Sequence, residues 1–328
     1  MKKHKRSTFS GKLGFVLSAA GASVGLGNIW RFPYLAAKYG GGIFLLVYII
    51  LALTFGYTLI MAETSLGRMT RKSPVGAFES FGNSHFISIG GWINAIIPIL
   101  IVPYYSVIGG WVIKYLIEYF AGHSKTLAGD AYFTTFISNG WSTEICFIIF
   151  TLFTLGIIYA GVRNGIERVS RFMMPILIVL SLIIAVYSVT RPGAIEGVKY
   201  FLVPNFDHFS WMTVVSAMGQ MFYSMSLAMG IMITYGSYTR DDVSLVKSVN
   251  GIEIFDTGIA LLAGMMVVPA VYIFSGEAGT SQSGAGLMFM TLPKVFSQMP
   301  GGRFIGLMFF ALVFLAALTS SVSIMEAI

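Results

Sequence analysis

Charged residues are scarce in this sequence. Only 11% of its 328 residues are Asp, Glu, Lys or Arg, whereas 56% are hydrophobic, and the mean hydropathy is +0.79. A soluble domain of this length needs a charged surface, so the composition excludes one. Repeated apolar stretches of about 20 residues are instead typical of helices that span a membrane. The sequence therefore predicts an integral membrane protein surrounded by a lipid bilayer.

Cysteine is almost absent as well. The single Cys146 lies in an apolar run, so no disulfide can form within the chain. The net charge of +7 does not predict a nucleic-acid partner, because the charges cluster at the ends of apolar segments, as membrane topology requires. The first apolar run lacks the small-residue cleavage site of a signal peptide and contains Asn28 and Arg31. We therefore expect this run to be the first membrane helix.

Eight apolar runs follow one another along the chain. They fall near residues 12–37, 42–67, 90–121, 142–161, 169–190, 211–238, 249–275 and 304–328. Placing the N-terminus inside gives every inner loop an excess of Lys and Arg, which is the usual bias of cytoplasmic loops. The loop at 276–303 has an apolar centre that predicts a short re-entrant or capping helix. The pattern predicts about eight transmembrane helices and a cytoplasmic N-terminus.

The first run contains a stretch that a plain membrane helix would avoid. In GASVGLGNIWRFP, residues 21–33, three glycines, an asparagine and an Arg-Phe-Pro end interrupt the apolar sequence. Unwound backbone is tolerated inside a membrane only beside protein or a water-filled cavity, and its freed carbonyls can bind Na⁺. Close helix packing by glycine is the alternative, but packing requires neither Asn28 nor Arg31. The stretch therefore favours a helix broken at an ion and substrate site.

The sixth run is interrupted in a similar way by YSMSLAMG, residues 223–230. Paired broken helices in corresponding positions of two halves indicate a substrate site at the bilayer midplane. Ser224 and Ser226 are candidate ligands there, although serine in a membrane helix also bonds to its own backbone. In the eighth run, the adjacent hydroxyls of Thr319 and Ser320 suit either a hard cation or helix packing.

Two acids, Glu63 and Asp256, lie at membrane depth. Carboxylates are costly there and are candidates for function. We expect Glu63 to bond the free backbone of a broken helix and Asp256 to be an ion ligand or a protonatable group. Glu253, one turn earlier, is expected to be solvated near the inner face. No nucleotide-binding loop or nucleophile–base arrangement is visible in the sequence, so it predicts no enzyme and no organic cofactor.

The chain resembles the neurotransmitter:sodium symporter family, in its bacterial amino-acid branch with the LeuT fold. The resemblance rests on GFVLSAAGASVGLGNIWRFPYLAAKYGGGIFLLVYI, MAETSLGR, GQMFYSMSLAMGIMITYGSY and LAALTSSVSIM, which follow the family's order along essentially the whole chain. It implies an all-α inverted-repeat membrane fold in a single transporter domain, 1–328, with helices 1 and 6 broken at mid-membrane. Residues 1–191 would form the first five-helix repeat, and 211–328 would form the first three helices of the second.

The resemblance also implies two sodium sites and a substrate site. The first sodium site would use Ser23, Asn28, Ser224 and Asp256, and the second would use Gly21, Val24, Ala316, Thr319 and Ser320. The amino acid would contact Ala22, Ser23, Gly25, Ile101, Tyr105, Tyr223, Ser224, Ser226, Met229, Ser320 and Ile324. The outer gate would include Arg31, and the inner gate would include Arg6 and Tyr238, with Phe9 packed beneath the core.

These residues together predict sodium-coupled symport of a neutral, hydrophobic amino acid by alternating access, in a cell (inner) membrane. Asp256 would supply the negative charge that chloride gives other members, which predicts chloride independence. Met229 would leave a roomy apolar pocket.

Family members have eleven or twelve helices, so we expect a truncated form that lacks the acidic partner of Arg31. A fragment that binds Na⁺ and amino acid without transporting them, and a proton-coupled carrier in which Asp256 titrates, are the alternatives; the oligomeric state stays open.

Overall fold

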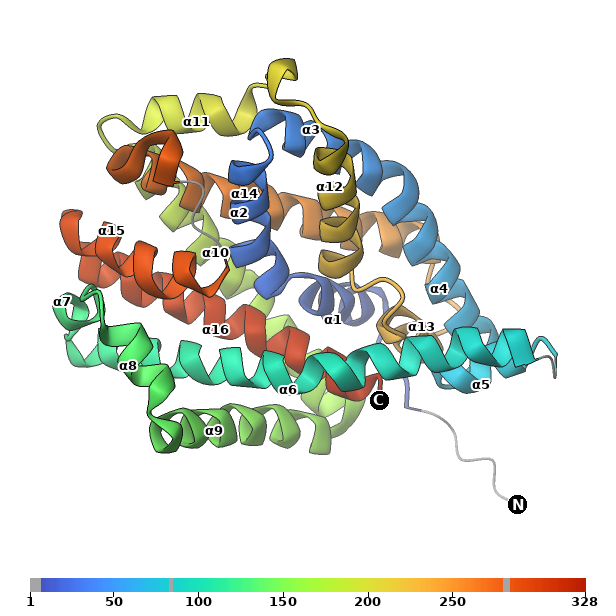
Figure 1. The fold of residues 1–328 in the computed structure, drawn as a ribbon. Coiled ribbons are helices and arrows are strands. Elements are labelled where there is room, and N and C mark those ends of the chain that lie inside the picture. The colour runs from blue at the N-terminus through green and yellow to red at the C-terminus, as the bar shows by residue number, and fades with distance from the viewer. Residues whose placement is uncertain (1–6, 83–84, 280–283) are drawn as a thin grey trace.

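The computed structural model describes residues 7–82, 85–279 and 284–328, and their regular structure is helical, as Figure 1 shows. The first half of the chain forms α1 (Lys12–Ser23), η1 (Gly27–Arg31), α2 (Phe32–Lys38), α3 (Gly42–Leu51), η2 (Ala52–Gly56), α4 (Tyr57–Thr70), α5 (Pro74–Glu79), α6 (His85–Ala121), α7 (Ser124–Leu127), α8 (Tyr132–Ser138), α9 (Gly140–Tyr159), η3 (Val162–Glu167) and α10 (Arg168–Val189).

The second half forms α11 (Ala194–Leu202), η4 (Phe206–His208), α12 (Trp211–Ser224), α13 (Ile231–Ser237), α14 (Leu245–Gly279), η5 (Leu287–Thr291), α15 (Leu292–Gln298) and α16 (Gly302–Glu326). The apolar centre of the 276–303 segment forms a short helix, η5 and α15, as expected. However, α14 extends to Gly279 and so takes up the first part of the segment that the apolar pattern assigns to this loop.

Six continuous helical stretches of the described residues are long and apolar enough to cross a membrane. They are Gly42–Thr70, His85–Ala121, Gly140–Tyr159, Val162–Val189, Leu245–Ile273 and Gly302–Glu326. The pair Lys12–Ser23 and Gly27–Lys38 is also long and apolar enough when it is counted as one span, and it bends by 49° at its break. The apolar run at 211–238 becomes α12 and α13, and neither reaches the length of a span alone. The chain is a multi-pass membrane protein, and the count of eight stays a prediction.

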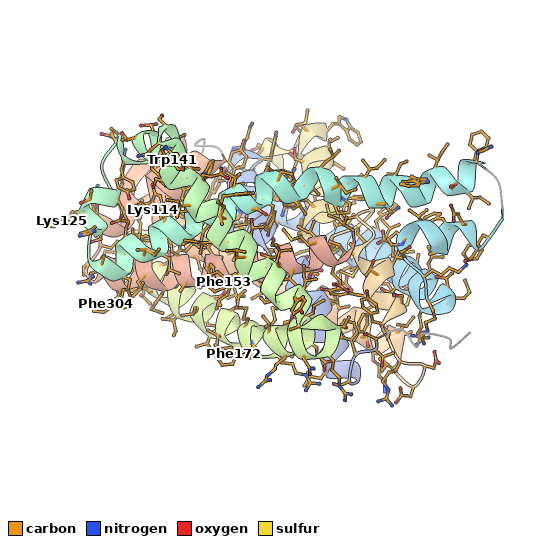
Figure 2. The ribbon with its side chains drawn as sticks, turned by 90° about the horizontal axis from the view of Figure 1, so that it is seen from below. Lys114, Lys125, Trp141, Phe153, Phe172 and Phe304 are labelled. Atoms are coloured by element: carbon orange, nitrogen blue, oxygen red, sulfur yellow. The ribbon has the colours of Figure 1, made fainter. Side chains whose placement is uncertain are left out.

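The spans differ in how far the protein covers them. The most apolar window of α9 is only 17% buried, whereas that of α16 is 72% buried. Figure 2 shows large apolar side chains on the outside of the bundle, among them Phe153 of α9 and Phe172 of α10, which are 53% and 70% exposed. Exposed rings of this size are stable in lipid, so α9 and α10 form part of the lipid-facing surface.

At the centre of the bundle, α1 is buried on every side. All its residues from Gly14 to Ser23 are buried, and it packs against α10, α14 and α16. Small residues on α1 and α16 allow the two backbones to approach closely, which is the usual way that helices associate within membranes. A Cβ atom added to Gly21 would lie 3.3 Å from the Thr319 Cβ atom. This close crossing brings the break in the first span against the polar end of α16.

Candidate functional site

The first broken helix turns its carbonyl groups toward α16. The backbone leaves helical geometry at Val24, which is extended (φ −78°, ψ 96°), and becomes helical again in η1. The Ser320 hydroxyl of α16 lies 3.2 Å from the carbonyl oxygens of Gly21 and Ala22, and 3.3 Å from that of Val24. Because one hydroxyl hydrogen serves one acceptor at a time, these carbonyls keep the capacity to bind a cation.

The residues expected in the second sodium site meet at this crossing. The Thr319 hydroxyl, next to Ser320, lies 3.0 and 3.1 Å from the carbonyl oxygens of Leu315 and Ala316 and can donate to either of them. The expected set of Gly21, Val24, Ala316, Thr319 and Ser320 therefore lies where α1 and α16 touch. Its donors are carbonyl and hydroxyl oxygens only, and hard cations such as Na⁺ prefer oxygen ligands. The chemistry of the set fits a small monovalent cation.

The second broken helix is held open by two polar side chains. Between α12 and α13, Ser226 and Ala228 have φ angles of 55° and 57°, in the left-handed region that side chains disfavour. Glu63 of α4 accepts a hydrogen bond from the Ala228 backbone N–H at 2.8 Å. Asn94 of α6 accepts one from the Gly230 N–H at 3.0 Å. Glu63 thus lies against the unwound backbone, and Asn94 is a second support that the sequence reasoning missed.

A buried carboxylate lies beside the two breaks. Asp256 of α14 accepts a hydrogen bond from the Asn28 amide at 2.8 Å and from the Tyr48 hydroxyl at 2.9 Å, and the Ser224 hydroxyl lies 3.3 Å away. All four side chains are buried. Among the described residues, no basic side chain forms an ion pair with Asp256. A buried carboxylate without a cationic partner is costly in a membrane, and a bound cation would remove that cost.

Ser23 supplies a further indication that the site takes an ion. Its hydroxyl is buried and has no hydrogen-bond partner within the described part of the chain. It lines the same central cavity as Ser224. Thus Asn28, Ser224 and Asp256 are joined by hydrogen bonds, and Ser23 lies beside them. Tyr48 is an addition that the sequence reasoning missed, although a lone tyrosine hydroxyl within FLLVYIIL was a signal of a buried polar contact.

The substrate contacts that the family resemblance implies surround one central cavity. It is lined by Ala22, Ser23, Gly25, Gly27, Ile101, Tyr105, Tyr223, Ser224, Ser226, Met229, Ser320 and Ile324, so every expected contact is present and Gly27 is added. Its volume is about 20 Å³, roughly that of one water molecule. Side chains must therefore move apart before an amino acid can enter.

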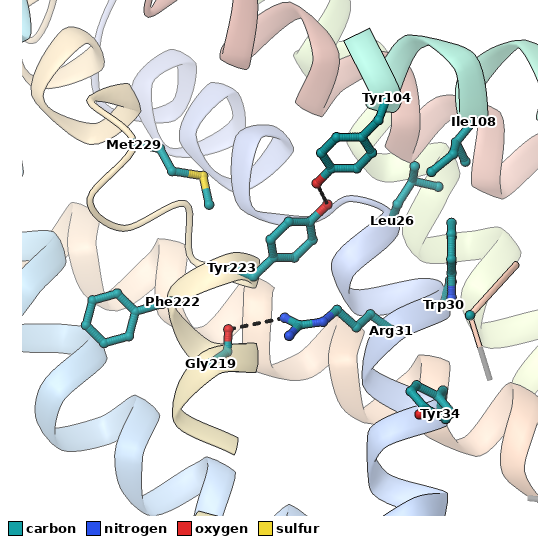
Figure 3. Close-up of a pocket in the computed structure, with 11 residues that line it drawn as sticks. Leu26, Trp30, Arg31, Tyr34, Tyr104, Ile108, Gly219, Phe222, Tyr223 and Met229 are labelled. Atoms are coloured by element: carbon teal, nitrogen blue, oxygen red, sulfur yellow. Dashed lines mark hydrogen bonds between the residues drawn. The ribbon is translucent and has the colours of Figure 1, made fainter. Parts of the chain in front are cut away.

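A larger cavity of about 580 Å³ (Figure 3) shares Tyr223 and Met229 with the central one. The hydroxyls of Tyr104 and Tyr223 meet at 3.1 Å. Arg31 lies over the Tyr223 ring, 5.2 Å from its centre, and donates to the Gly219 carbonyl at 3.2 Å. Tyr223 therefore lies between the two cavities, and Arg31 covers its ring from the side of the larger one. Tyr104 is absent from the sequence-based set of site residues.

At the opposite end of α1, the chain is packed around Phe9. The Phe9 N–H donates to the Tyr238 carbonyl at 3.0 Å, and its ring lies 5.6 Å from that of Tyr235. The Tyr238 hydroxyl donates to Glu326 at 2.8 Å. Arg6, the other residue expected at the inner gate, lies outside the described residues. Phe9 is 1% exposed, so this end of the core is sealed in the structure.

The expectation for Glu253 is wrong. Its side chain is 7% exposed, and its Oε1 atom has no hydrogen-bond partner in the described part of the protein. The apolar pattern starts this helix at residue 249, but α14 begins at Leu245. Glu253 therefore lies two turns inside a helix that packs against α1, and not at its solvated end.

Comparison with known proteins identifies the family of the chain. The family model of the sodium:neurotransmitter symporter family matches residues 6–147 and 118–328. The uncharacterised sodium-dependent transporter YhdH of Bacillus subtilis (strain 168) is 35% identical over 331 residues, which cover 100% of this chain and 73% of that protein. The sodium- and chloride-dependent taurine transporter of Rattus norvegicus is 28% identical over 369 residues, which cover 97% of this chain and 59% of that protein.

A solved structure is similar over nearly the whole chain. The crystal structure of MhsT in complex with L-phenylalanine matches with a TM-score of 0.90 and 36% identity, covering 98% of this chain and 74% of that one. This match confirms the expected all-α fold. These relatives are transporters and not enzymes, and their sodium dependence implies that this protein uses Na⁺. The chain belongs to the sodium:neurotransmitter symporter family.

Proposed function

We propose that this protein couples the inward movement of Na⁺ to that of a neutral, hydrophobic amino acid and does not need chloride. The observation that carries the proposal is the lining of the central cavity. Ile101, Met229 and Ile324 give the lining apolar side chains, whereas backbone from the first break and the Tyr105 hydroxyl give it polar groups. The apolar side chains suit the side chain of a hydrophobic amino acid, and the polar groups suit its charged groups. The L-phenylalanine bound by the similar protein MhsT is of this class.

Two Na⁺ sites are proposed beside that cavity. One uses the Asp256 carboxylate with Ser23, Asn28 and Ser224. The other uses Gly21, Val24, Ala316, Thr319 and Ser320, whose oxygens carry no formal charge. In the first site Na⁺ offsets the charge of Asp256, and the ion and the substrate carboxylate attract each other in one pocket. Substrate and Na⁺ then favour each other's binding, because each lowers the cost of burying the other's charge.

Two coupled ions supply enough free energy to concentrate a neutral solute. Each charge that moves inward gains about 2.3 kcal/mol per 100 mV of membrane potential. A tenfold Na⁺ gradient adds about 1.4 kcal/mol per ion. Two ions therefore supply on the order of 7 kcal/mol, which corresponds to about five decades of substrate concentration.

Chloride independence follows from the fixed charge of Asp256. A site that lacks such a carboxylate needs a mobile anion to neutralise Na⁺, whereas in this chain the Asp256 side chain supplies the negative charge. Some relatives are named as chloride-dependent, such as the rat taurine transporter. The chloride dependence of this protein is therefore tested separately. Replacing chloride by gluconate should leave sodium-dependent binding and uptake unchanged. A strict requirement for chloride would refute this part of the proposal.

Transport is proposed to occur by alternating access across a cell (inner) membrane, with the N-terminus in the cytoplasm. The side with the Phe9 packing is then the inner side, and the cavity of about 580 Å³ opens toward the outside. Rotation of Arg31 and Tyr223 would close the outer passage over a bound substrate, and separation of Phe9 from Tyr238 would open the inner one. Labelling of a cysteine placed at residue 72 from one side of intact cells would test this orientation.

The function is tested with the purified full chain. Equilibrium binding of labelled phenylalanine, leucine, tryptophan and glycine is measured in NaCl and in choline chloride, and uptake is then measured in proteoliposomes. We expect sodium-dependent binding of the hydrophobic amino acids, uptake driven by a Na⁺ gradient, and loss of both in Asn28→Ala. Asn164→Ala, at an exposed position of η3, is the matched control.

Three other outcomes would each contradict part of the proposal. Sodium-dependent binding without uptake would identify a chain that binds without transporting. Binding that depends on pH but not on Na⁺ would identify a proton-coupled carrier in which Asp256 titrates. A clear preference for glycine would refute the hydrophobic substrate class, because the Ile101 and Met229 side chains would then have no role in recognition.

A further inference from the structure

A separate cavity of about 520 Å³ lies at the far end of α4, away from the substrate site. Its lining comes from the last two turns of α4, from the residue that follows α4, and from the segment that leads from α13 into α14. It consists of Ser65, Arg68, Met69, Arg71, Asp241 and Leu245. The two regions are packed together, since α4 contacts both α13 and α14 (Figure 1). None of these residues takes part in the substrate or sodium sites described above.

Two side chains that line this cavity have hydrogen-bond donors that are not used within the described residues. The Arg68 guanidinium gives one hydrogen bond from Nη1 to the Val243 carbonyl at 2.7 Å, which fixes its position. It forms no ion pair with any described residue, so most of its five N–H donors remain available. The Ser65 hydroxyl, one turn earlier on the same face of α4, also forms no hydrogen bond with a described residue. A guanidinium and a hydroxyl side by side are a typical pair of donors for a phosphate oxygen.

The surrounding charge is positive on balance. Arg71 pairs with Asp241, and Arg240 pairs with Asp242, so these two acids are already neutralised. Arg68, Lys72 and Lys247 remain without an ion pair among the described residues. The 35-residue helix α14 also begins at this cavity, with Leu245 in its lining. The first N–H groups of a helix lack intrahelical acceptors and favour an anion.

The edge of the cavity is apolar and exposed. Met69, which lines it, is 66% exposed, and Val246 in the first turn of α14 is 54% exposed. α4 is the last part of a membrane span and ends at Thr70, so this edge lies where hydrocarbon gives way to water. A free phosphate ion would use only the polar side of such a cavity. A phospholipid would use both, with its acyl chains against Met69 and its phosphate against Arg68.

We propose that this cavity binds the phosphate group of an anionic phospholipid, with Arg68 and Ser65 as its donors. A bound lipid would hold α4 against the connection from α13 to α14, because Arg68 joins the two through Val243. That connection starts at Tyr238, the residue packed against Phe9, so the lipid would stabilise the arrangement in which this end of the core is sealed.

The test counts lipids bound to the purified full chain by native mass spectrometry and measures its thermal stability in detergent. The probes are dioleoyl phosphatidylglycerol, dioleoyl phosphatidylcholine and sodium phosphate. We expect wild-type protein to bind and be stabilised by phosphatidylglycerol in preference to phosphatidylcholine. Arg68→Gln should weaken phosphatidylglycerol binding about five- to tenfold, the effect of one basic residue near a membrane surface. Arg163→Gln, which removes an exposed arginine of η3 outside the cavity, should change it less than twofold.

Each alternative result has a clear meaning. Equal binding of the two lipids by wild-type protein, or equal losses in Arg68→Gln and Arg163→Gln, would overturn the proposal. Stabilisation by sodium phosphate equal to that by phosphatidylglycerol would overturn the lipid as the source of the phosphate. Ser65→Ala leaves the Arg68–Val243 hydrogen bond intact, so it serves as the second variant if Arg68→Gln does not fold. It should lower phosphatidylglycerol binding by more than twofold, and unchanged binding would count against the site.

Discussion

The Tyr48 hydroxyl of α3 lies 2.9 Å from the Asp256 carboxylate of α14, and 3.0 Å from the Ser224 hydroxyl that also approaches that carboxylate. The tyrosine therefore links the membrane-buried acid to the end of α12, where the second helix breaks. Asn28 approaches the same carboxylate from the first broken helix. Both breaks are thus connected to one charge, and an ion that binds at Asp256 would act on both halves of the site together.

Tyr48→Phe should weaken this connection. The change removes the donor to one carboxylate oxygen and leaves the ring. The expected loss of stabilisation of that carboxylate is about 1.5 to 3 kcal/mol, the range for a hydrogen bond to a charged group. Sodium affinity, measured by the Na⁺ dependence of phenylalanine binding, should fall about tenfold. Tyr159→Phe, at a position that is 96% exposed, is the control and should have no effect. Equal sodium affinities for Tyr48→Phe and wild type would contradict a role for Tyr48 at this site.

Gly25→Ala should abolish substrate binding without preventing folding of the rest of the bundle. A Cβ atom at Gly25 would lie 2.3 Å from the Ser320 Oγ atom and 2.8 Å from the Tyr105 hydroxyl oxygen. Ser320 cannot move away easily, because its hydroxyl contacts three carbonyls of the first break. The matched control is Gly156→Ala in α9, where an added Cβ meets nothing within 4 Å.

The measurement is phenylalanine binding together with thermal stability for both glycine variants. We expect Gly156→Ala to match wild type in binding and to be at least as stable, since alanine is the better helix former. Gly25→Ala should lose binding by more than tenfold. Wild-type binding in Gly25→Ala would mean that the first break moves freely against α16, contrary to the packing described above.

Glu63→Ala should destabilise the break in the second helix. The Ala228 N–H would lose its acceptor inside the protein, and an unsatisfied buried donor costs about 1 to 3 kcal/mol. Residues 226 and 228, held in the left-handed region, would then be free to rearrange. Glu63→Gln keeps an oxygen acceptor of the same length and should retain most of the stability. If thermal unfolding showed the same loss for Ala and Gln, the charge of Glu63 and not its hydrogen bond would be the important feature.

The sequence contains enough information to locate the breaks but not their supports. Glycines, Asn28 and two serines within apolar runs are inconsistent with plain helices, so local physics alone indicates both interruptions. Asn94 and Tyr104 gave weaker signals, because a single polar residue in an apolar run predicts a polar contact without indicating the partner. Their partners, Gly230 and Tyr223, lie 136 and 119 positions away. Only the folded arrangement brings such pairs together.

The residues that line the central cavity were predictable for a different reason. Nothing in the spacing of Ile101 and Ile324 relates them to each other, and it was the family resemblance that grouped them around one cavity. Helix ends were less predictable, as Glu253 shows. The apolar pattern defines where a helix is hydrophobic, whereas the helix itself continues through polar residues as long as its backbone hydrogen bonds are satisfied. The start of α14 at Leu245 therefore could not be read from hydropathy.

Asp130→Asn should lower thermal stability at neutral pH but not in acid. Asp130 lies between α7 and α8 and pairs with Lys294 of α15, which holds the pKa of its carboxyl below the usual value of about 3.9. Because the folded-state pKa is the lower one, the pairing stabilises the protein fully above the unfolded pKa and is lost as the pH falls through the folded one. The unfolding temperatures of variant and wild type should therefore differ at pH 7 and converge as the pH falls below about 4.

Both side chains of this pair face solvent, so the difference should be small and should shrink in 1 M salt, where the screening length is about 3 Å. Asp207→Asn is the control, since the Asp207 carboxylate forms no ion pair with a described residue. The pair connects the segment that follows α6 to α15, the helix that precedes α16. Both α6 and α16 contribute residues to the lining of the central cavity. If the Asp130→Asn difference persisted unchanged at low pH or in high salt, its origin would be local packing and not the charge on Lys294.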